Sequence, residues 1–258
     1  MRWTDAAFRS CLTLVLLTVL LMLPPLAVGQ AQQPAPPAPA VLPQATSAPP
    51  VPAPTLPNVA PRFLVVLDAA HGGDDTGARI TDRLLEKDIA LSLSARLRSI
   101  LSAHGIGVFT TRDSDVNPSA TSRAEAANRN SAAACILIHA TATGSGVHLY
   151  TSSLAPTPVT RFMPWPTTQS GYVTQSLKLS SEIDSALAHA EIPVTLGRTS
   201  LQPMDSFACP AVAIEIAPLA AGASTKAKPL TDTAYQRSIL DALTAAIDEW
   251  RNDWRQQP

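Results

Sequence analysis

The sequence lacks any long run of Lys and Arg, and its charges nearly cancel. It carries 19 Lys and Arg against 20 Asp and Glu, which gives a formal net charge of -1. Proteins that bind nucleic acid usually show a basic patch or stripe that meets the phosphates. The sequence therefore predicts no nucleic-acid partner, and a polyanionic partner of any kind is not expected.

Motifs for phosphate binding and for covalent catalysis are also missing. The glycines at 72 and 73 belong to neither G-x-G-x-x-G nor a Gly-Lys-Ser/Thr motif, and Asp74-Asp75 would repel phosphate. No G-x-S-x-G nucleophile elbow occurs. Neither Cys135 nor Cys209 has a nearby histidine in a recognisable nucleophile motif. These absences argue against nucleotide binding and against a serine or cysteine hydrolase.

The N-terminus matches a secretory signal peptide. Basic residues precede an apolar run at 12–23, and small residues stand at 27–29. The run is shorter than the roughly 20 residues that a membrane-spanning helix needs, and Pro24-Pro25 interrupt the apolar stretch. We expect a signal peptide at 1–29 and an exported protein of the periplasm or cell envelope. Membrane contact is expected only through this segment if it stays uncleaved.

Residues 30–61 are rich in Pro, Ala, Gln and Ser, a composition that opposes regular helix and sheet. We expect a disordered linker there, either a spacer for the following domain or a low-complexity segment without a role. Cys11 would leave with the signal peptide. Cys135 and Cys209 would remain, and in an oxidising compartment they could pair or stay as free buried cysteines. The sequence leaves both possibilities open.

From 62 to 254 the pattern alternates between strands and helices. The helix expected from residue 86 has apolar residues at spacings of three and four, and Gly105 supplies its stop. A capping box, Ser122-x-x-Glu125, predicts another helix start. The alternation predicts one α/β domain of three layers, with a mostly parallel twisted sheet flanked by helices. Strands are expected at 63–67, 107–111, 135–139, 147–151 and 212–216, and helices at 86–104, 122–130, 173–189 and 233–254.

Four polar residues stand at or near expected strand ends. His71 comes after the first strand, His139 ends the third, and Glu215 lies in the late strand. Glu86 opens the first helix, where the helix N-terminus favours negative charge and the side chain can point back to the same rim. Ligands of open α/β sheets bind beyond the carboxyl ends of the strands. The four groups should therefore converge if the sheet is parallel.

Two histidines and one carboxylate are the usual ligands of zinc in hydrolytic sites, where water takes the remaining position. The sequence thus offers His71, Glu86 and His139 as ligands of Zn²⁺. Glu215 would be the general base that moves a proton from water to the leaving nitrogen of an amide. Taken singly, each residue also has a structural interpretation: a scaffold histidine, a first-turn helix charge, or half of a buried ion pair.

The ordered set of motifs resembles the zinc-dependent N-acetylmuramoyl-L-alanine amidase catalytic domain (amidase type 3), over about residues 63 to 250. The resemblance implies a fold like that of zinc exopeptidases and phosphorylases, zinc held by His71, Glu86 and His139, and catalysis by Glu215. It also implies peptidoglycan as the partner, cut between N-acetylmuramic acid and L-alanine in cell-wall remodelling, daughter-cell separation or autolysis, with a protein activator possible. The matching motifs are His71-Gly72-Gly73, Glu86-Lys87-Asp88, Thr111-Arg112-Asp113, Arg123 with Asn128, Ile138-His139-Ala140 and Pro210 to Glu215.

The rim departs from the family pattern at three places. Asp68-Ala69-Ala70 stands where the family usually has Asp-Pro-Gly, Thr141 where it often has an acidic residue or Asn, and Ala217-Pro218 where it tends to Gly-Phe. None of these removes an expected ligand. Two alternatives therefore remain beside the amidase: a non-catalytic secreted peptidoglycan-binding protein of the same fold, and a zinc hydrolase that acts on free peptides.

Some members of that family carry an inhibitory helix near the segment that here spans 152–170. Four prolines in this stretch oppose a long helix, so we expect a loop over or beside the cleft. Phe162 and Trp165 are expected to pack on the domain in preference to touching substrate. Scaffold or surface positions are expected for His104, His148 and His189.

Overall fold

The computed structural model describes residues 63–222 and 226–256. The signal peptide expected at 1–29 and the linker expected at 30–61 lie outside the described residues. Within the part of the chain that is described, no helix is both long and apolar enough to cross a membrane.

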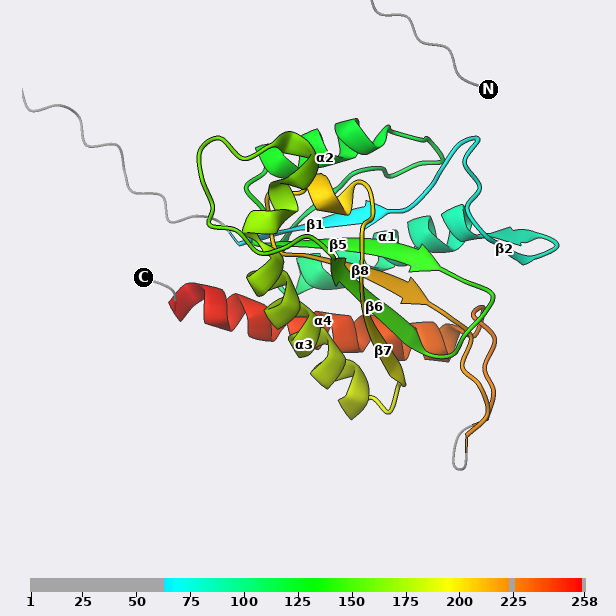
Figure 1. The fold of residues 1–258 in the computed structure, drawn as a ribbon. Helices are drawn as coiled ribbons and strands as arrows, with labels where there is room; N and C mark the ends of the chain where they lie inside the picture. The colour runs from blue at the N-terminus through cyan, green and yellow to red at the C-terminus, as the bar shows by residue number, and fades with distance from the viewer. Residues whose placement is uncertain (1–62, 223–225, 257–258) are drawn as a thin grey trace, which may run out of the picture. The chain divides into compact units, whose positions relative to one another are not determined.

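A six-stranded sheet forms the centre of the domain (Figure 1). Its strands are β1 (Leu64–Ala69), β4 (Gly107–Thr110), β5 (Ala134–Ala140), β6 (Val147–Ser152), β7 (Val194–Thr199) and β8 (Ala211–Ile216). They lie in the order β4-β1-β5-β8-β6-β7. All neighbours are parallel except β6 and β8, which are antiparallel. The predicted mostly parallel sheet is confirmed, and β1, β5 and β8 end at one common edge, which we call the rim.

Helices cover both faces of the sheet, which confirms the three layers (Figure 1). α1 (Glu86–Ala103), α3 (Val173–His189) and α4 (Thr233–Gln256) enclose the larger apolar cluster on one face. The other face carries a smaller cluster under α2 (Ala120–Arg129) and the 3-10 segments η1 (Trp165–Gly171) and η2 (Met204–Ser206). The smaller cluster does not extend to the rim, which leaves that part of the sheet for polar side chains.

The structure differs from the predictions in the start of α2 and in three strands. α2 is capped by Ser119, whose hydroxyl accepts a hydrogen bond from the backbone N–H of Ser122, so the capping box at Ser122 is wrong. Ser122 therefore lies in the first turn, and Glu125 pairs with Arg129 instead of with a cap. The strand β7 and the hairpin of β2 (Arg79–Thr81) and β3 (Leu84–Leu85) were not predicted. All three are short or half-exposed and carry no continuous apolar run.

Cys135 and Cys209 form a disulfide, which resolves the alternatives that the sequence left open. Cys135 lies near the start of β5, and Cys209 comes just before β8. The bond therefore joins two neighbouring strands at the edge of the sheet opposite the rim. Their other ends carry His139 and Glu215.

The segment 152–170 contains no α-helix, as its four prolines predicted, although its last residues belong to the 3-10 segment η1. The expected place of this loop over or beside the cleft is wrong, however. β6 runs antiparallel to β8, so the chain leaves β6 at the edge opposite the rim. Packing of Phe162 on the domain is also wrong, because its exposed fraction is 87%. Trp165 is 39% exposed.

Candidate metal centre and general base

The alternation of side chains along the strands brings the predicted residues to one face. On β5, Ile136 and Ile138 belong to the larger apolar cluster, whereas Cys135 and Leu137 belong to the smaller one. His139 lies on the same face as Cys135 and Leu137, because successive side chains of a strand point to opposite faces. Glu215 continues the corresponding series of β8 and is the register partner of His139. Both side chains therefore project at the rim on the face of the smaller cluster.

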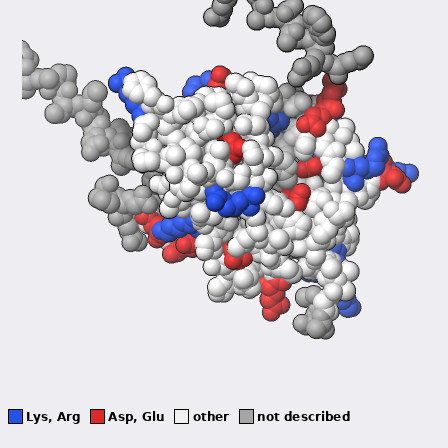
Figure 2. Space-filling model, in the orientation of Figure 1, with Lys and Arg blue, Asp and Glu red and all other residues white. Residues whose placement is uncertain are grey.

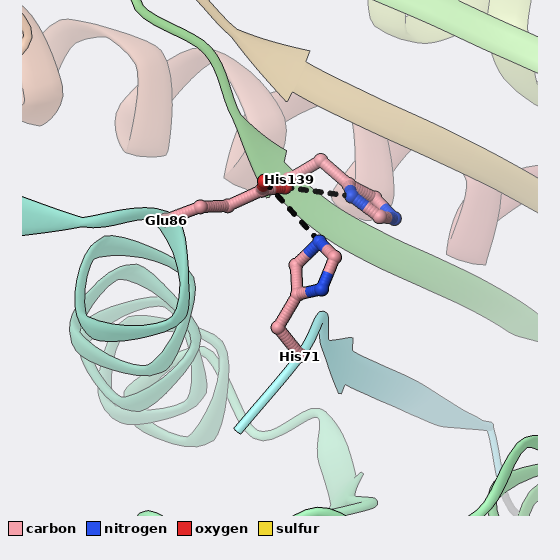
Figure 3. Close-up of side chains that lie close together, drawn as sticks. All are labelled: His71, Glu86 and His139. Carbon is pink, nitrogen blue, oxygen red and sulfur yellow. Dashed lines mark hydrogen bonds and ion pairs between the residues drawn. The ribbon is translucent and has the colours of Figure 1, made fainter. Parts of the chain in front are cut away.

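Glu86 joins the two predicted histidine ligands (Figure 3). Its Oε1 lies 2.9 Å from Nδ1 of His139, and its Oε2 lies 3.2 Å from Nε2 of His71. The two rings meet edge to face with their centroids 5.6 Å apart. Ligand atoms of the three side chains all lie within 4.8 Å of one another, so these groups could hold a metal ion. The structure thus brings together the three residues that the sequence singled out as ligands.

A tight turn after β1 aims His71 at this cluster. His71 itself has a positive φ of 58°, a conformation that is costly outside glycine, and Gly72 comes next with φ 131°. The turn returns Asp75 to the ring, where its Oδ2 lies 2.9 Å from Nδ1 of His71. Since an ionised carboxylate only accepts, Nδ1 carries the proton and Nε2 faces Glu86. Sequence reasoning missed this role of Asp75.

Two buried arginines hold the backbone that carries His71. The guanidinium of Arg123 pairs with Asp68 at 2.9 Å and donates to the carbonyls of Ala69 and His71, each at 2.7 Å. Arg112 donates to the carbonyls of Ala69 and Ala70, each at 2.8 Å. The residues Ala69-Ala70, which depart from the family pattern, thus still present the carbonyls that fix the turn.

The charges of the cluster are strongly coupled. Burial would raise the pKa of Glu86, but hydrogen bonds from His139, His71 and the N–H of Ala78 outweigh burial and hold that pKa well below its usual range. The hydrogen bond to Glu86 raises the pKa of His71 against the effect of burial, and Asp75 adds to the rise. A carboxylate that stays ionised between two ring nitrogens favours a positive charge there, carried either by protons or by a metal ion.

Acidic side chains also gather around the rim. Figure 2 shows them on the right-hand side of the view, towards which β5 and β8 point in Figure 1. Asp74 and Asp75 of the turn are exposed, and Asp115 is held beside the turn by Lys87 at 2.7 Å. Several carboxylates near one opening create a negative potential that attracts cations.

Glu215 lies next in the row after His139 and is 32% exposed. Its Oε2 is 2.7 Å from Nδ1 of His148, at the start of β6. His148, for which the sequence predicted a scaffold or surface position, thus contacts the predicted general base. His104 and His189 do lie at the surface, the former paired with Asp248. The alternation at 147–151 places His148 opposite Val147 and Leu149, but it does not reveal which strand lies beside it.

Comparisons with known proteins agree with this fold. The family model described as N-acetylmuramoyl-L-alanine amidase matches residues 65–249. The N-acetylmuramoyl-L-alanine amidase AmiA of Escherichia coli (strain K12) is 40% identical over 77 residues, which are 30% of this chain and 27% of AmiA. The matched part thus spans under a third of that curated relative.

Two solved structures show the same fold. The catalytic domain of CwlV, an N-acetylmuramoyl-L-alanine amidase from Bacillus (Paenibacillus) polymyxa var. colistinus, superposes with a TM-score of 0.56 at 21% identity, over 74% of this chain and 98% of that one. The CwlD amidase from Clostridioides difficile, solved in complex with the GerS lipoprotein, has a TM-score of 0.56 at 21% identity, over 74% of this chain and 100% of that one.

Proposed function

Because the chain belongs to the N-acetylmuramoyl-L-alanine amidase family, we propose that it hydrolyses the amide between N-acetylmuramic acid and L-alanine in peptidoglycan. The observation that carries the proposal is the convergence of His71, Glu86 and His139 at the rim, with Glu215 beside them in register. A metal site next to a partly exposed carboxylate is an arrangement that supports amide hydrolysis by water.

The residues of the cluster fit Zn²⁺. Two histidines and one carboxylate form the ligand set of many hydrolytic zinc sites. Asp75 accepts from the second ring nitrogen of His71, the outer contact that ligating histidines usually make. We assign His71, Glu86 and His139 as the residues that would hold the ion. When bound, Zn²⁺ would supply a Lewis acid that polarises the amide carbonyl and makes water acidic enough to attack near neutral pH.

Glu215 is assigned as the general base and then the general acid. Its carboxylate takes a proton from the attacking water while a C–O bond forms at the carbonyl carbon of the lactyl group. The proton then passes to the amide nitrogen as the C–N bond breaks. A carboxylate remains on the muramic acid, and a free amine remains on L-alanine. The exposure of Glu215 leaves it open to water and to substrate.

Export to the periplasm or cell envelope forms part of the proposal. The disulfide of Cys135 and Cys209 supports it, because structural disulfides form and persist mainly in oxidising compartments. There the protein would serve cell-wall remodelling, daughter-cell separation or autolysis. A protein activator is compatible with the proposal, since a structure of the CwlD amidase contains the GerS lipoprotein.

Zinc content and peptide release, measured on one preparation, test the proposal. The purified chain should contain about one zinc and release stem peptides from sacculi. Glu215→Gln should keep the zinc and lose the release, whereas His139→Ala should lose both. Glu125→Gln, an exposed carboxylate on α2, is the matched control and should behave as the unchanged chain.

Two outcomes would favour the alternatives. Zinc and sacculus binding without release by the unchanged chain would support a non-catalytic peptidoglycan-binding protein. Cleavage of free peptides with intact sacculi would support a peptide hydrolase. Absence of zinc from the unchanged chain would overturn the metal assignment itself.

A further inference from the structure

His148 makes a contact that the proposed function does not use. Its Nδ1 lies 2.7 Å from Oε2 of Glu215. The two residues are register partners on the antiparallel strands β6 and β8. The contact therefore results from strand pairing, which brings directly opposed side chains close together on one face. Glu215 thus has His139 beside it on β5 and His148 beside it on β6.

We propose that His148 is a positioning residue that fixes the orientation of Glu215 for proton transfer, a role that rests on the proposed function. An ionised carboxylate can only accept a hydrogen bond, so Nδ1 of His148 carries the proton and donates. This bond holds Oε2 of Glu215. The other oxygen, Oε1, is left to take the proton from water, and rotation of the carboxylate would break the bond.

The ring of His148 is itself held in place. A Cβ built on Gly144 would come within 2.6 Å of Cε1 and 2.8 Å of Nε2 of His148, so the backbone of Gly144 packs against the far edge of the ring. On another side the ring of Tyr150 meets it edge to face, with centroids 6.5 Å apart. The side chain of His148 is 16% exposed, half the fraction of Glu215. A restrained donor of this kind is what a precisely placed base requires.

The contact of His148 with Glu215 should matter more for the reaction rate than for folding stability. A contact between partly exposed groups contributes little to folding, because water competes for both partners. By contrast, a misplacement of about 1 Å can cost roughly a hundredfold in rate. Loss of the His148 donor should therefore lower kcat while the folded state survives.

A matched pair of substitutions separates positioning from packing. Leu and Asn branch at the same carbon and are similar in size, but only Asn can donate a hydrogen bond from about the place of Nδ1. Kinetics on a soluble muramoyl peptide should show that His148→Leu lowers kcat by about ten- to a hundredfold with KM nearly unchanged. His148→Asn should restore most of the rate, and both variants should keep their zinc.

One further measurement does not depend on the rate of the unchanged site. Ring ¹⁵N NMR should show a protonated Nδ1 for His148, with a resonance that shifts in Glu215→Gln. His104→Leu, at the surface pair with Asp248, is the control and should leave kcat unchanged.

Three results would overturn the role of His148 alone: an unchanged kcat in His148→Leu, equal losses in the Leu and Asn variants, or a His148 resonance indifferent to Glu215→Gln. Failure of the unchanged chain to cleave any muramoyl peptide would instead overturn the proposed function, and this role with it. The two failures are thus distinguishable.

Discussion

The hydroxyl of Tyr235 donates to the carbonyl of Ala217, two residues after Glu215, at 3.0 Å. The same hydroxyl lies 3.2 Å from the carbonyl of Gly146, two residues before His148. Tyr235 belongs to α4 and is buried. One phenol from the last helix therefore joins the end of β8 to the start of β6, beside the pair that we assign to proton transfer.

Tyr235→Phe should lower the free energy of unfolding by about 1 to 2 kcal/mol, because it removes a buried hydrogen bond and leaves a carbonyl of Ala217 without this donor. Urea unfolding at pH 7 measures the change. An unchanged midpoint would show that the bond contributes nothing to stability.

The same residue gives a pH dependence. Burial raises the pKa of Tyr235 to about 12, whereas an unfolded phenol titrates near 10. The folded chain thus keeps a proton that the unfolded chain loses between these values, and stability is lost as the pH rises through this window. The unfolding free energy of the unchanged chain, minus that of Tyr235→Phe, should be constant below about pH 10 and fall above it. A difference that stays flat to about pH 11 would contradict the assignment.

Gly77→Ala should weaken zinc binding. The added Cβ would lie 2.6 Å from Oε2 of Glu86 and 2.6 Å from Cδ2 of His71, so both assigned ligands must shift. We expect a loss of zinc affinity of about tenfold or more, measured by competition with a chelating indicator. Gly105→Ala is the matched control: its φ of 72° resembles the 62° of Gly77, but nothing lies within 4 Å of the new Cβ. Equal zinc affinities in the two variants would refute the steric argument.

Arg123→Met should cost about 3 to 5 kcal/mol, because Asp68 would stay buried without its cation. Arg129→Met, on the same helix, removes only an exposed pair with Glu125 and should cost about 0.5 kcal/mol or less. Adding Asp68→Asn to Arg123→Met should recover part of the loss. Urea unfolding of the unchanged chain and of the three variants measures these costs. Similar losses in Arg123→Met and Arg129→Met would rule out the buried ion pair as a main support of the turn.

Removal of the disulfide should lower stability by about 4 kcal/mol, since the bond closes a loop with a sequence separation of 74 residues. Cys135→Ala with Cys209→Ala should match the unchanged chain under reductant. Thermal unfolding with and without reductant is the measurement. If reductant left the midpoint of the unchanged chain where it was, the bond would have no stabilising role.

The convergence of His71, Glu86 and His139 could be predicted because the sequence around each residue indicates its place at a strand end or a helix start. Two of them come after or end apolar runs, and the third opens a helix with regular apolar spacing. Carboxyl ends of parallel strands meet at one edge, so local marks were enough to predict a common rim. The same reasoning identified Glu215 from a charge inside an apolar strand.

The contact of His148 with Glu215 could not be predicted in this way. A strand at 147–151 shows the same alternation whether it runs parallel or antiparallel to its neighbour, and only long-range packing sets its direction. The contact of Asp75 with His71 depends on a positive φ at His71 itself. The sequence does not indicate such a φ, because it is uncommon in residues other than glycine. Ser119 and Ser122 are both suitable helix caps, and local sequence did not decide between them.

Because β6 runs antiparallel to β8, the loop that follows β6 and the rim lie at opposite edges of the sheet. The loop at 153–164 leaves the sheet at the edge opposite Glu215, and Phe162 within it is almost fully exposed. An affinity handle or a fluorophore inserted in this loop would stand on the side of the domain away from the rim. If the protein were tethered to a surface through that handle, its rim would face outward. The rim would then be accessible to insoluble peptidoglycan, the proposed substrate, which cannot diffuse into a covered site.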